Sequence, residues 1–196
     1  MARTGRRPGD SGTREAILAA ARASFAQRGY DATSIRAVAA AAGVDPALVH
    51  HYHGGKAELF AAAMRLPVNP AELIAALLDE GVDGFGPRLI GRVLEIWDAG
   101  GDDSPLLGLL RSAATNEAAA AMLREFLAGE VIGKALARID SDRRELRASL
   151  AASQVMGLLM ARYVVRIEPL ASADRETLAP LVGETLQRYF AGELPA

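Results

Sequence analysis

The sequence predicts an all-α protein in which a small N-terminal helix-turn-helix domain precedes a larger helical domain. Three observations support this fold class. Apolar residues recur at helical spacing along most of the chain, without the period-2 alternation of strands. Residues 33–56 resolve into two short helices around a glycine turn. The 196 residues, 51% of them hydrophobic, are enough for one good core or two small ones.

The chain begins with a basic, glycine-rich stretch over residues 1–12, which has no periodicity and is predicted to be a flexible arm. This arm either touches DNA phosphates or is simply solvated. The first helix is predicted from about Thr13 to Arg28, because its apolar residues form one stripe and Gly29 follows its end.

The two helices of the motif are predicted from their caps. Thr33 is a suitable N-cap for a helix over about 34–41, and Gly43 tolerates the left-handed backbone that ends it. Asp45 then caps a second helix, Pro46 to about Tyr52, with proline at the first position. In a helix-turn-helix the second helix presents its N-terminal residues to base edges, so we expect this segment to enter the major groove of DNA.

A fourth helix is predicted after Gly55, and the helix-breaking pair Pro67 and Pro70 follows it. We take this proline pair as the joint between two domains. The predicted organisation is an arm over 1–12, a DNA-binding domain over 13–66, a joint over 67–71 and a helical ligand-binding and dimerisation domain over 72–196.

Beyond the joint, amphipathic patterns predict further helices over 71–79, 87–98, 105–114, 117–138, about 144–166 and about 174–191. The last two are unusually apolar, and the run from Val155 to Val165 is too short for the roughly 20 residues that cross a bilayer, so we expect a buried helix. Two such helices favour packing against a second copy of the chain. A well-buried monomeric core is the alternative.

Charge and composition limit the functional classes. The net charge is −2, but residues 1–58 hold eight Lys or Arg against five acids, a net of +3 on an acidic body. Such asymmetry is typical of a protein with one end on a polyanion, although chance also produces it. The absence of cysteine excludes disulfides, thiolate zinc sites and cysteine nucleophiles. No signal-peptide pattern begins the sequence, so a cytoplasmic location is expected.

The run from about Thr13 to Leu59 resembles the tetracycline-repressor (TetR) family of bacterial transcriptional regulators over a quarter to a third of the chain. The positions that carry the family pattern are Gly29, Tyr30, Thr33, Gly43, Val44, Asp45, His50, Tyr52, His53 and Lys56. Two of them depart from it. His50 stands where the family most often has Tyr, and His53 stands where an apolar Phe packs under the recognition helix. A buried imidazole at that place needs a polar partner.

The resemblance implies a set of DNA contacts. Pro46 and Ala47 occupy positions where bases are read, so contact with thymine methyl groups is expected to contribute. Phosphates are expected near Thr33 and Arg36, where a helix N-terminus favours negative charge. The implied contacts are Thr33, Ser34, Arg36, Pro46, Ala47, the base- or phosphate-contacting His50 and His51, and the backbone-clamping Tyr52 and Lys56.

These observations lead to the hypothesis of a ligand-responsive repressor that binds a palindromic operator as a homodimer through the helices at 144–166 and 174–191 and is released by a small-molecule inducer. The candidate inducer contacts are polar or aromatic residues on otherwise apolar helices. They are Trp97, Arg111, Asn116, Gln154, Arg162 and Tyr163.

Other functional classes fit the sequence less well than a ligand-responsive repressor. His50 and His53 have metal-ligand spacing, but Asp45 and Glu58 are poorly placed to complete a site, so no metal or cofactor is expected. The glycines before Lys56 lack the remaining residues of a phosphate loop. No nucleophile or paired carboxylate occurs at a recognisable spacing, which makes an all-helical enzyme a poor alternative. A constitutive architectural DNA-binding protein without inducer is the closer one.

Overall fold

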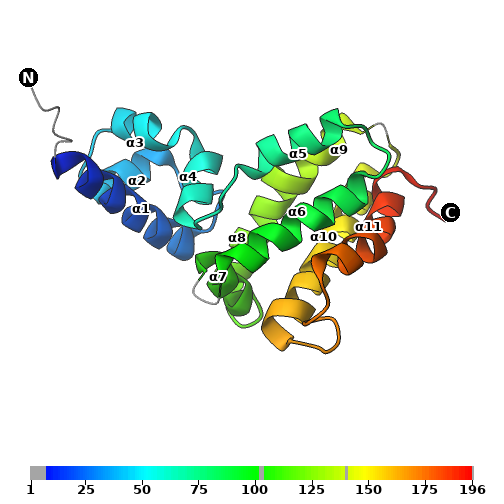
Figure 1. Ribbon diagram of the computed structural model, residues 1–196. Helices are drawn as coiled ribbons and strands as arrows, with labels where there is room; N and C mark the ends of the chain where they lie inside the picture. The colour runs from blue at the N-terminus through cyan, green and yellow to red at the C-terminus, as the bar shows by residue number, and fades with distance from the viewer. Residues whose placement is uncertain (1–7, 102–103, 140, 196) are drawn as a thin grey trace, which may run out of the picture.

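The structure is a computed structural model that describes residues 8–101, 104–139 and 141–195. Every regular element within these ranges is a helix, as the all-α prediction requires. Helices α1–α4 form a small bundle at one end of the molecule, and α5–α11 form a larger one at the other (Figure 1).

The small bundle consists of α1 (Pro8–Arg28), α2 (Ile35–Ala42), α3 (Pro46–His53) and α4 (Lys56–Ala63). Helix α1 begins at Pro8, within the arm predicted over 1–12, so the helical part of the chain starts earlier than predicted. The physical reason is that proline at a first helical position has its φ preset and lacks an N–H that the helix would not use. Residues 1–7 of the predicted arm lie outside the described ranges.

The larger bundle contains the helices predicted beyond the joint, with boundaries shifted by a few residues. They are α5 (Pro70–Asp79), α6 (Phe85–Gly100), α7 (Pro105–Ala113), α8 (Glu117–Phe126), η1 (Leu127–Ile132), α9 (Gly133–Arg138), α10 (Arg144–Leu159), η2 (Met160–Val165) and α11 (Arg175–Ala191). The helices predicted over 117–138 and 144–166 therefore each contain a π-helical segment, η1 and η2. Such a change in backbone hydrogen bonding cannot be seen in an apolar pattern.

Two apolar cores hold these helices together, and their division does not coincide with the predicted joint. One core extends from α1–α4 into α7 and α8, where it includes Leu110, Met122 and Phe126. The other lies among α5, α6, α9, α10 and α11, with Phe85 against Phe190 at a ring-centroid distance of 4.9 Å. The larger bundle is thus packed directly onto the smaller one.

The contact between the two bundles is centred on Phe126. Its ring lies 4.4 Å from that of Phe60 on α4 and 5.7 Å from that of Tyr30 in the α1–α2 turn, measured between centroids. The neighbouring carboxylate, Glu125, accepts a hydrogen bond from the backbone N–H of Asp31 at 2.9 Å. The C-terminal end of α8 therefore packs against, and hydrogen-bonds to, the turn that leads into the helix-turn-helix.

Helices α6 and α11 pack so closely that their crossing requires glycine on both sides. A Cβ at Gly86 would lie 2.2 Å from the Gly183 carbonyl oxygen, and one at Gly183 would lie 2.3 Å from Pro87 Cα. Gln187 of α11 fastens the same place, because its Oε1 accepts from Gly86 N and its Nε2 donates to the Val82 carbonyl, each at 2.9 Å.

Helix α10 is fastened to the end of α11 by Arg147, whose side chain is almost fully buried. Its guanidinium donates to the Tyr189 and Gly192 carbonyls at 2.9 and 3.0 Å and pairs with the Asp142 carboxylate. The hydrogen bonds that the Asp142 carboxylate accepts from Arg147 and from Arg143 hold its pKa below its usual range. The two C-terminal helices are thereby fixed relative to each other.

The continuous helix Arg144–Val165 is long and apolar enough to pass a length-and-composition test for a membrane span, yet only 22% of its apolar window is buried. The expectation of a buried helix over Val155–Val165 was therefore wrong for the single chain. Large apolar side chains stand exposed here and on the segments that follow, because no other described residue covers them. They are Leu146 (47% exposed), Val165 (61%), Ile167 (51%) and Leu181 (68%).

The glycine crossing yields a stability prediction. Gly86→Ala should lower the free energy of unfolding by about 2–3 kcal/mol, because the new Cβ meets backbone atoms that cannot move without separating α6 from α11. Urea unfolding followed by circular dichroism measures this. Gly91→Ala on the same helix is the matched control, since its Cβ would make an ordinary 3.7 Å contact with Ala179. Equal effects of the two substitutions would contradict the close crossing.

Candidate nucleic-acid interface and ligand groove

The start of α2 differs from the prediction at Thr33. The N-cap is Ser34, whose hydroxyl accepts from Ala37 N at 3.2 Å. Thr33 is buried at 2% exposure, and its hydroxyl donates to the Gly29 and Ser24 carbonyls at 2.7 and 3.2 Å. Thr33 therefore ties the α1–α2 turn to the end of α1. Its contact with a phosphate stays a prediction. Sequence alone could not decide between two adjacent hydroxyl residues that can both cap.

The turn and the start of α3 follow the prediction. Gly43 adopts the left-handed conformation with φ 68°. The Asp45 carboxylate accepts from Ala47 N at 2.7 Å, and Pro46 occupies the first helical position. Val49 is completely buried in the core of the small bundle, where α3 packs against α2 and α4, and the opposite edge of α3 is exposed. The second helix of the motif is thus capped, anchored and exposed along one side.

Most of the predicted DNA contacts are accessible in the structure. Ser34, Arg36, Ala47, His50 and His51 are exposed, and Pro46 and Tyr52 are half-buried. The exposed edge of α3 also includes Leu48, which the sequence analysis did not single out. The available signal was its place between Ala47 and the buried Val49, off the helix stripe that faces the core.

Lys56 has a partner within the chain. Its Nζ donates to the Asp31 carbonyl at 2.9 Å and lies 4.5 Å from the centroid of the Tyr30 ring. The α1–α2 turn is consequently held from two sides, by Lys56 of α4 and by Glu125 of α8. A phosphate clamp by Lys56 stays a prediction, and the structure adds that this side chain also positions the turn.

His53 is buried, as expected for a position that packs under the recognition helix, and only 6% of it is exposed. Its Nε2 has no hydrogen-bond partner among the described residues. Burial lowers the pKa of His53 below its ordinary value of 6.5, and the positive charge of Arg14 lowers it further. The imidazole is therefore kept neutral at a place where a phenyl ring would need no partner.

The arrangement of α1–α4, with a capped and exposed second motif helix beside a larger helical body, is that of a helix-turn-helix DNA-binding regulator. The family model described as "Bacterial regulatory proteins, tetR family" matches residues 17–63. The model described as "Tetracyclin repressor-like, C-terminal domain" matches residues 83–190. The chain belongs to the TetR family of transcriptional regulators, which confirms the resemblance found in the sequence.

Two solved structures are similar to the chain, and the first of them supports this assignment. A TetR-family regulator (SCO0857) from Streptomyces coelicolor A3 is 41% identical, with 95% of this chain and 98% of that chain covered and a TM-score of 0.54. A TetR-like transcriptional regulator from Rhodococcus sp. RHA1 is 23% identical, with 97% and 100% covered and a TM-score of 0.45. None of the curated proteins compared with the chain matches it.

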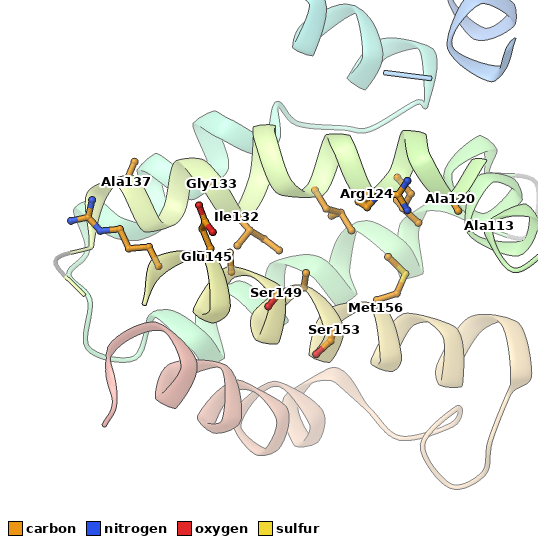
Figure 2. Close-up of a pocket in the computed structure, with 15 residues that line it drawn as sticks. Ala113, Ala120, Arg124, Ile132, Gly133, Ala137, Glu145, Ser149, Ser153 and Met156 are labelled. Carbon is orange, nitrogen blue, oxygen red and sulfur yellow. The ribbon is translucent and has the colours of Figure 1, made fainter. Parts of the chain in front are cut away.

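A groove of about 770 Å³ runs between the rod formed by α8, η1 and α9 on one side and α10 on the other (Figure 2). Its wall is mostly apolar, with charged residues near its ends. Its lining includes Leu123, Arg124, Leu127, Ile132 and Met156. An inner apolar cavity of about 110 Å³ adjoins the groove, shares Leu123, Leu127 and Met156 with it, and reaches Trp97.

None of the six predicted ligand residues lines the groove, and several of them make polar contacts within the chain. Their contact with a ligand stays a prediction. Asn116 caps α8 by accepting from Ala119 N at 3.0 Å. Arg162 donates to the Leu170 and Ala173 carbonyls at 2.8 Å. Polar residues on apolar helices here satisfy the backbone near helix ends, which is the commoner reason for their presence.

Trp97 and Tyr163 do come together, away from the groove. Their rings stack at 5.5 Å, and the Tyr163 hydroxyl donates to Asp98 Oδ1 at 2.7 Å. Burial raises the pKa of Tyr163, and the Asp98 hydrogen bond raises it further. Both rings line a separate cavity of about 270 Å³. Of the remaining two candidates, Arg111 is exposed on α7 and Gln154 is half-buried on α10.

The buried imidazole yields a prediction with a definite sign. Below about pH 6.5 the unfolded chain binds a proton at His53 that the folded chain resists, so stability falls as the pH decreases through 6.5 toward the lowered folded pKa. His53→Phe should remove this contribution and raise the free energy of unfolding at pH 7.5 by about 1 kcal/mol, because no polar atom is left unpaired.

Urea unfolding at pH 7.5 and 5.5 measures both effects. The matched control is His51→Ala, an exposed histidine on the same helix, which should leave the free energy of unfolding at pH 7.5 close to the wild-type value. A His53→Phe protein that is less stable than the wild type at both pH values would show that the imidazole has a favourable partner after all.

Proposed function

We propose that this protein is a homodimeric, ligand-responsive repressor that acts in the cytoplasm and releases a palindromic operator when a small molecule enters the groove beside α8. The observation that carries the proposal is the double role of the single helical turn at which α8 passes into η1. Leu123, Arg124 and Leu127 line the groove, and Glu125 and Phe126 contact the DNA-binding bundle. A ligand that moves this turn also moves the α1–α2 turn.

The exposed apolar face of α10, η2 and α11 supports a dimer. Helix Arg144–Val165 is apolar along its length but mostly uncovered, and Leu181 stands outward from α11. Contiguous exposed apolar surface marks an interaction site, and a two-fold pair of such faces would cover itself. The pair would place two α3 helices on half-sites spaced roughly 34 to 36 Å, one turn of DNA.

Induction in this proposal is a population shift. The ligand binds more tightly to a state in which the two recognition helices no longer match the operator spacing, and it can release DNA only by that difference in affinity. The π-helical segment η1 begins directly after Phe126 and supplies groove residues Leu127 and Ile132. Because the backbone hydrogen-bond pattern already changes from α-helical to π-helical here, a ligand in the groove could displace the end of α8 at this place.

Dimeric operator binding is tested at Leu181. Leu181→Glu puts a charge on the proposed interface, so light scattering at micromolar concentration should report a monomer, and operator affinity should fall by at least about tenfold because each monomer holds one half-site. Ala76→Glu, at an exposed position of α5 outside this face, is the control and should stay dimeric. A monomeric wild-type protein, or full operator affinity in the Leu181→Glu monomer, would contradict the proposal.

Coupling through α8 is tested at Glu125, using a compound that a thermal-shift screen shows to stabilise the protein. The ratio of operator dissociation constants with and without the compound should be about 5- to 150-fold in the wild type. In Glu125→Ala it should fall toward one, because the Asp31 N–H loses its acceptor and the α1–α2 turn no longer follows α8.

Glu95→Ala is the control, since Glu95 is an exposed carboxylate of α6 that pairs with Arg92 in the described contacts and lines neither the groove nor the inner cavity. This variant should keep the wild-type ratio. Compounds that stabilise the protein without releasing DNA from the wild type would point to a constitutive DNA-binding protein.

A further inference from the structure

Large apolar side chains stand exposed at five places in the described part of the chain, and four of them belong to the C-terminal face discussed above. The fifth is Leu48, on α3, with 38% of its side chain exposed. It has no share in the proposed dimer face, because it lies on the helix-turn-helix. An isolated exposed leucine needs no explanation on an ordinary surface, but α3 is the helix that meets base edges.

The backbone of the first turn of α3 has little to offer a base. Pro46 has no N–H, the Ala47 N–H donates to the Asp45 carboxylate at 2.7 Å, and the Leu48 N–H donates to the Asp45 carbonyl at 2.9 Å. The strong N-cap that starts this helix therefore consumes the donors that a helix N-terminus would otherwise present. The backbone N–H groups of this turn are therefore not available to donate hydrogen bonds to base edges.

The side chains of the same turn are equally apolar. Pro46, Ala47 and Leu48 carry no polar side-chain atom, and the exposed ones are Ala47 and Leu48. Leu48 reaches furthest from the helix axis of the three. In the major groove of DNA the bases offer one apolar group, the C5 methyl of thymine.

We infer that Leu48 is a specificity-determining residue that contacts the C5 methyl of a thymine in each operator half-site. The inference rests on the proposed binding of an operator by α3 and names what this helix recognises there. Sequence preference at that base pair then comes from apolar contact with the methyl group, and the histidines further along α3 contribute separately.

The test starts from the operator obtained by selecting bound sequences from random DNA. Each thymine of a half-site is replaced in turn by deoxyuridine, which removes only the methyl group, and affinity is measured by fluorescence anisotropy at constant salt. For the wild type, one replacement per half-site should weaken binding about fourfold, and the pair about fifteenfold, as expected for one buried methyl group each.

The variant Leu48→Ala tests whether Leu48 is the residue that contacts this methyl group. This variant should bind the thymine operator more weakly than the wild type and should show no further loss on the deoxyuridine operator. The substitution is at an exposed position, and circular dichroism checks that the fold is kept. His50→Ala, an exposed neighbour on the same helix, is the matched control and should keep the full deoxyuridine penalty whatever its own affinity.

A second measurement separates the methyl group from the rest of the base pair. At the responsive position, a 5-methylcytosine·guanine pair should bind the wild type more tightly than a cytosine·guanine pair, and Leu48→Ala should not distinguish them.

Three results would overturn the inference. They are a wild type insensitive to every deoxyuridine replacement, an equal penalty in the wild type and Leu48→Ala, and loss of the penalty in His50→Ala. The first two leave operator binding itself intact, so they refute the role of Leu48 alone. Selection that recovers no bound sequence would refute operator binding, and the inference with it.

Discussion

The packing of Phe126 against Tyr30 and Phe60 is the contact on which the rest of the structure depends. It places three aromatic rings from α8, the α1–α2 turn and α4 in one core, so that the small bundle is not simply tethered to the large one. Aromatic pairs bury much apolar surface and hold a preferred geometry. In the proposed induction, a displacement of α8 would be transmitted to the helix-turn-helix through this packed interface.

Two hydrogen bonds to the backbone of Asp31 hold the α1–α2 turn at the contact between the two bundles. Glu125 accepts from the Asp31 N–H, and Lys56 donates to the carbonyl of the same residue. The peptide groups on both sides of Asp31 are thus held by different helices, one in each bundle. Thr33, buried two residues later, uses its hydroxyl to tie the turn back to α1. The turn is therefore held by α1, α4 and α8 at once.

Much of the helix-turn-helix could be predicted because its signals are local. Gly43, Asp45 and Pro46 act through backbone conformation and hydrogen bonds to residues a few positions away, and the structure has them as predicted. The cap of α2 was misplaced by one residue, since Ser34 and Thr33 have the same local chemistry and only the burial of Thr33 distinguishes them. The ligand residues were harder still. Asn116 and Arg162 were predicted because they are polar on apolar helices, and their backbone partners became visible only in three dimensions, so their contact with a ligand stays a prediction.

The sequence by itself determined the helical class, the order of the helices, the identity of the recognition helix and its unusual His53. All of these depend on periodicity, capping or single-residue chemistry, which are encoded over a few positions. Only the tertiary structure decided where the groove lies, that α8 both lines it and holds the DNA-binding bundle, and that Gly86 and Gly183 bring α6 and α11 into backbone contact. These features join residues up to about a hundred positions apart, and no local pattern carries information about which distant helix a given face will meet.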